Sequence, residues 1–388
     1  MKRWFIGGFV FAVVISACVC FINKTFWVDS FTGVSGSSSV KSLAIHLEKV
    51  VKPDFKQVFS SIEIIPLELN DSSMVGNIYG KKLYIPGKYY VIVDDGRIVK
   101  VFDMSGKYVA SSENCIGKGP SEYYIFQDVS YNYEDDTFVI LDPFGNLITY
   151  TSSFDFVSKK KISLQTTDRP RNLFILNSHL CILSDSVERG VFYVYDYSAD
   201  QLVKRVEYPG LIYSISSVQF PFNYVDKHLY FTPPEINDYV FEVDRESYMP
   251  ISFYHLDGGK NSITTDDVKD FEFGTEEGNQ YIMNESSKYS PVSRFFNTDY
   301  VVSTYIKNKE LYFNFCNVNS EKDITVRLKH GCFPTFPHFF ALDKDTLITI
   351  LYPFELNKYM DSSLVSNKEL IHLMNEEDNP CVVKYKLK

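Results

Sequence analysis

Basic residues are in short supply in this chain of 388 residues, which has 39 Lys and Arg against 49 Asp and Glu and a formal net charge of −10. Because binding to nucleic acid needs a basic surface that neutralises phosphates, this balance argues against a nucleic-acid partner. Catalytic signatures are missing as well: there is no H-E-x-x-H, no G-x-S-x-G and no close pair of histidines at metal-ligand spacing. No nucleophile–base pair can therefore be recognised from spacing.

Cysteine is sparse, with 7 residues, of which Cys18 and Cys20 lie in the N-terminal leader. The other five are an odd number at wide, irregular spacings, and none forms a C-x-x-C pair. A disulfide framework is therefore not indicated, although an oxidising compartment would allow a disulfide. Cys181 and Cys316 lie in alternating apolar stretches and are predicted to be core residues. The remaining cysteines are Cys115, Cys332 and Cys381.

One long uncharged stretch occurs, from Trp4 to Ile22, and it follows Lys2 and Arg3. A basic region followed by an apolar one predicts an export signal. Within it, Ile15-Ser16-Ala17-Cys18 resembles the lipobox of bacterial lipoproteins, so Cys18 is the predicted lipidation site and residues 1–23 the signal and membrane-anchor region. An uncleaved signal anchor is the alternative, because 19 uncharged residues approach a membrane-spanning length.

Both interpretations place the rest of the chain outside the cytoplasm, facing the periplasm and held at a membrane. No acidic run follows Cys18, so nothing indicates transport to the cell surface. The stretch GVSGSSS (Gly33–Ser39) is typical of a flexible linker. Residues 24–51 are therefore expected to be a tether, with the folded part beginning near Lys52.

The body of the chain is a repeat of short β-rich segments. Aromatic residues are plentiful, with 28 Tyr and 32 Phe against 2 Trp, as is typical of half-buried strands. Turn signals recur every 8 to 12 residues, and groups of four strands recur with the second strand beginning near Tyr89, Thr137, His179, His228, Tyr300 and Thr346. The spacing of about 40 to 50 residues with four strands per unit is typical of β-propellers. Six starts predict an all-β, six-bladed β-propeller over residues 52–388.

Two departures from the regular spacing have an explanation. One interval is about 25 residues longer than the others, and the excess is assigned to a surface loop at Asp257–Glu285. The last unit contains only three strands, whereas Ser61–Leu69 is a lone strand ahead of the first complete unit. This lone strand is expected to close the last blade as its fourth strand, so that no edge remains exposed there. A short helix is predicted over the last blade at Ser366–Glu376.

Five pieces of the chain carry a family resemblance: SIEIIPLEL from Ser61, IVKVFDMSGKYV from Ile98, IGKGPSEY from Ile116, the segment Phe336–Leu356 and the ending Glu376–Lys388. They resemble the six-bladed propeller lipoproteins of Bacteroidota-type bacteria, whose function is mostly unassigned. The resemblance spans about Phe55–Lys388 and implies the fold and its closure, but little chemistry. Family members usually read G-x-G-P-G-E-[YF], and this chain has Ser121 in place of the third of these glycines.

Candidate sites are few. Gly117–Tyr123 is interpreted as a tight crossing between blades rather than a phosphate cradle, because no helix or Lys-Ser/Thr pair follows. The acidic pairs are interpreted as solvated turns, with a calcium site as the alternative; they are Asp94-Asp95, Asp135-Asp136, Asp266-Asp267 and Glu376-Glu377-Asp378. A basic and aromatic channel mouth would suit an anionic or sugar ligand, and surface charge on loops is the alternative. Its candidate residues are Glu122, Tyr123, Arg169, Arg171, Arg294 and His338.

The leading hypothesis is a membrane-tethered, monomeric and non-enzymatic propeller that binds a glycan, peptide or protein partner without a cofactor. The alternative is a metal-dependent hydrolase or lyase, lactonase-like or amidating-lyase-like, with its site in the central channel. A receptor sensor domain is disfavoured, because no second apolar span occurs. The alternative needs side-chain oxygens at one level of the channel, for which the inner strands offer Asp128, Asn132, Asn172, Asn177, Asn223, Asp226 and Asn297.

Overall fold

The computed structural model describes residues 28–30, 40–51, 54–78, 80–163, 170–184, 191–207, 222–225, 228–233, 238–271, 276–328 and 335–388. The leader with Cys18 lies outside these ranges, as do Arg169, Asp226 and Cys332. Within the described ranges, no helix is long and apolar enough to span a bilayer.

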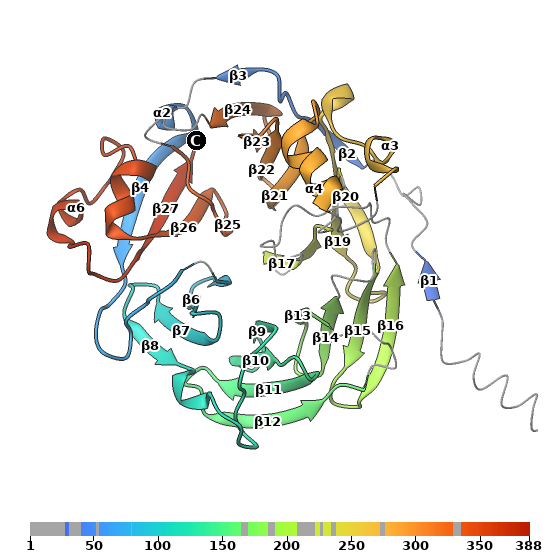
Figure 1. The fold of residues 1–388 in the computed structure, drawn as a ribbon, viewed down its shortest axis with the longest axis vertical. Coiled ribbons are helices and arrows are strands. Elements are labelled where there is room, and N and C mark those ends of the chain that lie inside the picture. Colours follow the sequence, from blue (N-terminus) through green and yellow to red (C-terminus); the bar gives the residue numbers. More distant parts are fainter. Residues whose placement is uncertain are drawn as a thin grey trace, which may run out of the picture.

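Six blades of four antiparallel strands form a ring, and the strands of each blade are named here from the innermost to the outermost (Figure 1). Blades 1 and 2 consist of β5 (Lys82–Ile85), β6 (Tyr89–Asp94), β7 (Ile98–Asp103) and β8 (Tyr108–Ser111), and of β9 (Asp128–Asn132), β10 (Thr137–Leu141), β11 (Asn146–Thr151) and β12 (Phe156–Lys161). Blades 3 and 4 consist of β13 (Asn172–Ile175), β14 (Leu180–Ser184), β15 (Val191–Asp196) and β16 (Gln201–Glu207), and of β17 (Phe222–Val225), β18 (His228–Phe231), β19 (Tyr239–Val243) and β20 (Pro250–Asp257).

Blade 5 consists of β21 (Ser290–Phe296), β22 (Tyr300–Lys307), β23 (Glu310–Asn317) and β24 (Lys322–Leu328), and blade 6 of β25 (Ala341–Asp343), β26 (Thr346–Leu351), β27 (Cys381–Leu387) and β4 (Phe59–Pro66). The predicted six-bladed propeller is therefore confirmed. Each predicted second-strand start agrees with the structure to within one residue, the single difference being β14, which begins at Leu180 rather than His179.

The hydrophobic core lies between neighbouring blades rather than in one central mass. Between blades 1 and 2, for example, Val91 and Val101 pack against Tyr131, Phe138 and Tyr150. Strands such as β10 (TFVIL) are buried along their whole length because both faces of the blade meet a neighbour. This explains why many segments of the sequence read as continuous apolar runs and not as alternating ones.

The N-terminal strand closes the ring as predicted. β4 pairs antiparallel with β27 from Phe59↔Leu387 to Pro66↔Cys381, two residues earlier than the predicted start. The strand also contacts blade 1, because Gly106 in the β7–β8 turn lies against the carbonyl oxygen of Pro66. Gly106 has a φ of +85°, and a Cβ at this position would approach that oxygen to 2.2 Å, so only glycine fits.

The predicted tether of residues 24–51 is folded onto the ring in much of its described part. β1 (Val28–Ser30), β2 (Lys41–Ala44) and β3 (Val50–Val51) pair in parallel with the outermost strands of blades 3, 4 and 5 (Figure 1). We call these three strands the N-terminal strap. The segment is not a free tether because its alternating apolar residues Leu43, Ile45 and Leu47 are all buried against blades 4 and 5.

The predicted surface loop at Asp257–Glu285 is also corrected, because its described part contains short helices with a small core of their own. They are η2 (Gly259–Asn261), α3 (Thr265–Val268), α4 (Glu276–Gln280) and the π-helix η3 (Tyr281–Glu285). Ile263, Val268 and Ile282 form the core. The other helices are α2 (Phe55–Val58), η1 (Glu113–Cys115), η4 (Pro353–Glu355), α5 (Leu356–Tyr359) and α6 (Glu369–Leu373), the last within the predicted helix of blade 6.

Candidate ligand site in the central lumen

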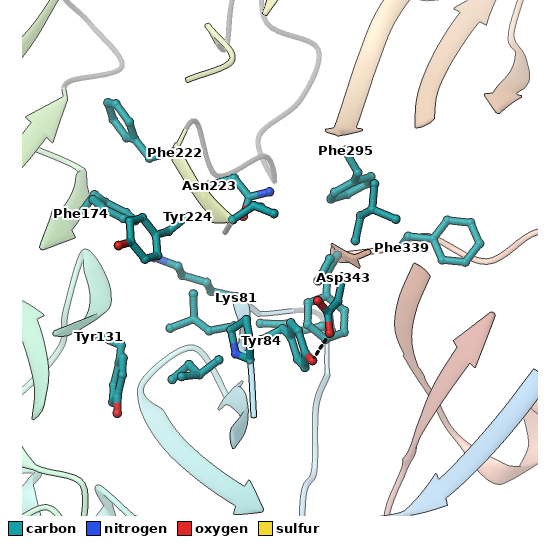
Figure 2. A pocket seen from close by; sticks show the side chains of 18 of the residues that line it. Lys81, Tyr84, Tyr131, Phe174, Phe222, Asn223, Tyr224, Phe295, Phe339 and Asp343 are labelled. Carbon is teal, nitrogen blue, oxygen red and sulfur yellow. Dashed lines mark hydrogen bonds between the residues drawn. The ribbon is translucent and has the colours of Figure 1, made fainter. Parts of the chain in front are cut away.

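The innermost strands of all six blades line one cavity at the centre of the ring, with a volume of about 210 Å³. Figure 2 shows side chains from several blades converging on this space, which we call the lumen cavity. Its walls are rich in aromatic residues because each inner strand contributes at least one, except β25, whose preceding segment supplies Phe339 and Phe340. The other aromatic lining residues are Tyr84, Tyr131, Tyr133, Phe174, Phe222, Tyr224, Phe295 and Phe296.

The acidic and basic side chains that line the lumen cavity are few and mostly basic. The one acid among the described lining residues, Asp343, accepts a hydrogen bond of 2.6 Å from the Tyr84 hydroxyl, which links blades 6 and 1 (Figure 2). Burial and this hydrogen bond raise the pKa of Tyr84 well above its usual range, so the hydroxyl keeps its proton. The basic lining residues are Lys81, Lys82, Arg294 and His338.

Two of these four basic residues have an acidic neighbour. Lys81 forms an ion pair with Asp128 of blade 2, and its side chain and that of Asp128 are only 18% and 4% exposed. Arg294 is buried with a guanidinium nitrogen 3.9 Å from a carboxylate oxygen of Asp238. Each of these charges is therefore balanced by the protein itself.

Lys82 is different, because its ammonium group has no ion pair within the described part of the chain and donates a hydrogen bond of 3.3 Å to the carbonyl oxygen of Gly80. Burial lowers the pKa of Lys82 to about 8. Its neighbour His338 also has a lowered pKa, caused first by desolvation and then by the charge of Lys82. At neutral pH the lumen therefore holds a protonated Lys82 beside a neutral imidazole.

The Lys81–Asp128 pair joins three blades at the wall of the lumen. Asp128 accepts hydrogen bonds from the backbone N–H groups of Val129 (2.8 Å) and of Leu173 in blade 3 (2.7 Å), and Lys81 also donates to the carbonyl oxygen of Val129 (2.7 Å). Burial lowers the pKa of Lys81 to about 8, against the opposing effect of Asp128. Burial has the opposite effect on the acid and raises the pKa of Asp128. Asp128 thus belongs to an interblade junction.

The structure separates the residues predicted at the channel mouth. Arg294 and His338 line the lumen cavity, whereas Glu122 and Tyr123 are not among its lining residues. The Glu122 carboxylate accepts a hydrogen bond of 2.7 Å from the N–H of Gly119, and Tyr123 is buried between blades 1 and 2 with its hydroxyl donating to the Arg97 carbonyl oxygen at 2.8 Å. Gly117–Tyr123 therefore acts as an interblade turn. Arg171 is exposed just before β13, and Arg169 lies outside the described residues.

The amide side chains offered for a metal site mostly stabilise turns. Asn132, Asn177 and Asn297 lie at or just after the ends of three inner strands, where the side-chain oxygen of each accepts one or two backbone hydrogen bonds from the following hairpin. Asn172 donates to the Ser184 hydroxyl, and only Asn223 of this set lines the lumen cavity. In the described residues, no group of three or more His, Cys, Asp or Glu side chains could hold a metal ion.

The acidic turns and the cysteines can also be compared with expectation. Asp94 is buried and accepts backbone hydrogen bonds from Gly76 and Asn77, so the prediction of a solvated turn is wrong there. Cys181 and Cys316 are core residues as predicted.

Sequence reasoning missed Lys82, although two consecutive lysines opening the first inner strand, in KKLYIPG, were a usable signal.

Comparison with known proteins agrees with this architecture. A family model described as a domain of unknown function (DUF4934) matches residues 40–386. The chain is similar to a Bacteroides fragilis NCTC 9343 protein whose name proposes that it is exported, with a TM-score of 0.67, 17% identity and coverage of 90% of this chain and 100% of that one. It is also similar to BamB from Moraxella catarrhalis, with a TM-score of 0.40, 9% identity and coverage of 74% and 72%. None of the curated proteins matches. The chain therefore belongs to the family of the domain of unknown function DUF4934, in the form of a six-bladed β-propeller.

Proposed function

We propose that the protein is an exported, membrane-tethered binding module that holds a small anionic ligand in its lumen and performs no reaction on it. The observation that carries the proposal is Lys82, a desolvated cation without an acidic partner in the described structure, set among aromatic walls. Small-molecule sites are mostly apolar cavities with a few placed polar groups, and this cavity has that composition. A carboxylate or phosphate placed beside Lys82 would compensate the charge that burial disfavours.

Export is supported by the leader and by the name of the Bacteroides fragilis neighbour, and tethering by the lipobox-like Ile15–Cys18. The ligand's anionic group would be part of a glycan or a peptide, or of a segment of a partner protein. Aromatic rings around a cationic group favour a sugar acid among these, because a sugar ring offers an apolar face for packing and an anionic substituent for Lys82.

Replacing Lys82 by Met tests the lumen site directly. We expect galacturonate to bind the wild type at pH 6.5 and to bind Lys82→Met about 10- to 100-fold more weakly, the range for a lost hydrogen bond to a charged group. Isothermal titration calorimetry measures this, with galactose as the neutral comparison. Lys107→Met is the matched control, because Lys107 is an exposed lysine of the same blade and does not line the cavity. Equal binding of galactose and galacturonate, or an unchanged affinity in Lys82→Met, would contradict the assignment.

The same titration has a defined pH dependence. Lys82 is protonated below its pKa of about 8, so affinity for galacturonate should fall as the pH rises through that value. Lys81 titrates in the same range but is paired with Asp128, while His338 is already neutral and Tyr84 stays protonated. The fall should therefore be smaller in Lys82→Met, and the part that remains reports the titration of Lys81.

The membrane anchor is tested at Cys18. We expect metabolic labelling with an alkyne fatty acid to mark the wild-type protein in its bacterial host and to leave Cys18→Ala unlabelled, because the acylated thiol is removed. Cys20→Ala should label normally. Labelling that persists in Cys18→Ala would refute the lipobox interpretation.

A further inference from the structure

A second cavity of about 200 Å³ lies beside the lumen cavity, where the inner strands of blades 2, 3 and 4 end. Its lining comes from the residues after β9, from β13 and its following turn, and from the β17–β18 and β19–β20 hairpins of blade 4. We call it the side cavity. None of the sites considered so far accounts for it.

The two cavities share a wall of three aromatic residues, Tyr133, Phe174 and Tyr224, which line both. The rings of Tyr133 and Tyr224 come from blades 2 and 4, which are not neighbours in the ring, and their centroids are 5.1 Å apart at an angle of 38°. Arg245 of the side cavity donates a hydrogen bond of 3.0 Å to the Tyr224 hydroxyl and lies over its ring. We call Tyr133, Phe174 and Tyr224 the partition aromatics; a ligand that occupied both cavities would pack against them.

The sizes of the cavities indicate what such a ligand would be. Pockets for drug-sized ligands measure roughly 300–1,000 Å³, so cavities of about 210 and 200 Å³ each fall short while the two together lie in that range. Each cavity is therefore suited to one unit of a ligand built from two or more linked units.

The side cavity also offers a different set of groups from the lumen cavity. It combines the partition aromatics and Tyr248 with acceptors (Glu134, Asp244), a donor (Arg245) and Asn177. Hydroxyl groups both donate and accept, so a mixed rim around aromatic rings suits a sugar ring better than a second fixed charge.

We infer that the side cavity is an extension subsite, and that the ligand is an acidic oligosaccharide of at least two units. Its anionic group lies by Lys82 in the lumen cavity, and the adjoining unit packs on Tyr133 and Tyr224. This inference rests on the proposed function, since it assumes that the lumen cavity takes the anionic unit.

Titration calorimetry with galacturonate and with the disaccharide galacturonosyl-galactose, whose second unit is uncharged, tests the inference. We expect the disaccharide to bind the wild type at least ten-fold more tightly than the monomer, and Tyr248→Ala to lose most of this gain while binding the monomer as before, because Tyr248 lines the side cavity and not the lumen cavity. Tyr248 is partly exposed, so the variant should fold, and Tyr248→Phe should keep the gain. Tyr124→Ala is the matched control, because Tyr124 is 58% exposed and lines neither cavity.

The outcomes separate the two claims. Monomer binding without any gain for the disaccharide overturns the extension subsite and leaves the lumen site standing. Absence of binding by both galacturonate and the disaccharide overturns both. A chain-length gain seen with oligoglutamate instead of the sugars overturns the saccharide assignment.

Discussion

Deletion of residues 59–66, which form β4, is expected to unfold the whole ring and not only blade 6. The strand supplies the outer edge of blade 6, and Phe59, Ile62 and Ile64 are among the most buried side chains of the protein. The Phe59 ring packs against those of Phe315 and Tyr385, whose centroids lie 5.7 and 5.2 Å from its own. Truncating one large core side chain costs about 2–5 kcal/mol, so the loss of all three is comparable to a typical total stability of about 5–15 kcal/mol.

Circular dichroism during heating and urea denaturation measures this effect. The deletion variant should show no cooperative transition, and the milder Ile62→Ala should unfold at lower urea with an unchanged slope. Val109→Ala is the control, because Val109 is 40% exposed on the outer strand of blade 1 and its truncation should change stability by less than about 0.5 kcal/mol. A deletion variant that melts cooperatively near the wild-type temperature would show that β4 does not close the ring.

Asp128→Ala is expected to cost about 3–5 kcal/mol, as is usual when one partner of a buried ion pair is removed. The substitution leaves the buried Lys81 ammonium without its acid, and it deprives the Leu173 N–H of its acceptor. Urea denaturation at pH 7 measures the loss. The double variant Lys81→Met/Asp128→Leu should be more stable than Asp128→Ala, because it leaves no uncompensated charge in the wall of the lumen.

The pH dependence identifies the cause of this loss. The pKa of Lys81 in the folded protein, about 8, lies below its unfolded value of 10.5, and without Asp128 it should fall further. At pH values between the folded and the unfolded pKa of Lys81, the unfolded state binds more protons than the folded state. The free energy of unfolding therefore rises with pH in this range. Asp128→Ala should therefore regain part of its lost stability between pH 7 and pH 10. A deficit that stays constant over this range would assign the loss to packing or hydrogen bonding alone.

The blades could be predicted from sequence because each one is built from the same kind of short apolar strand. Apolar strands such as TFVIL, bounded by turn residues, must be buried on both faces, and their spacing therefore reports the blade period. The strap escaped prediction since GVSGSSS suggested a linker, although Leu43, Ile45 and Leu47 alternate as a half-buried strand does. In the insertion, the helices are one or two turns long and depend on packing, which a periodicity of so few residues does not reveal.

The candidate site was less accessible to sequence reasoning. Arg294 and His338 were expected near the channel and do line the lumen cavity, but Glu122 was expected there too and instead fixes a turn between blades. Whether a residue reaches the lumen depends on the radius of the ring and on the way each inner strand faces. Those properties arise only when six blades meet, so the proximity of Lys82 and His338 follows from closure and from no single segment.

The order in which the chain is synthesised gives the strap and β4 a further consequence. Val28 pairs with Arg205, Lys41 with Tyr254, Val50 with Thr325 and Ile65 with Val382, so every early strand has a partner made much later. Such non-local pairings slow folding, and strands that wait without partners expose edges that promote aggregation. Each of these strands therefore remains without its partner until that partner has been synthesised, and β4 waits for almost the whole chain.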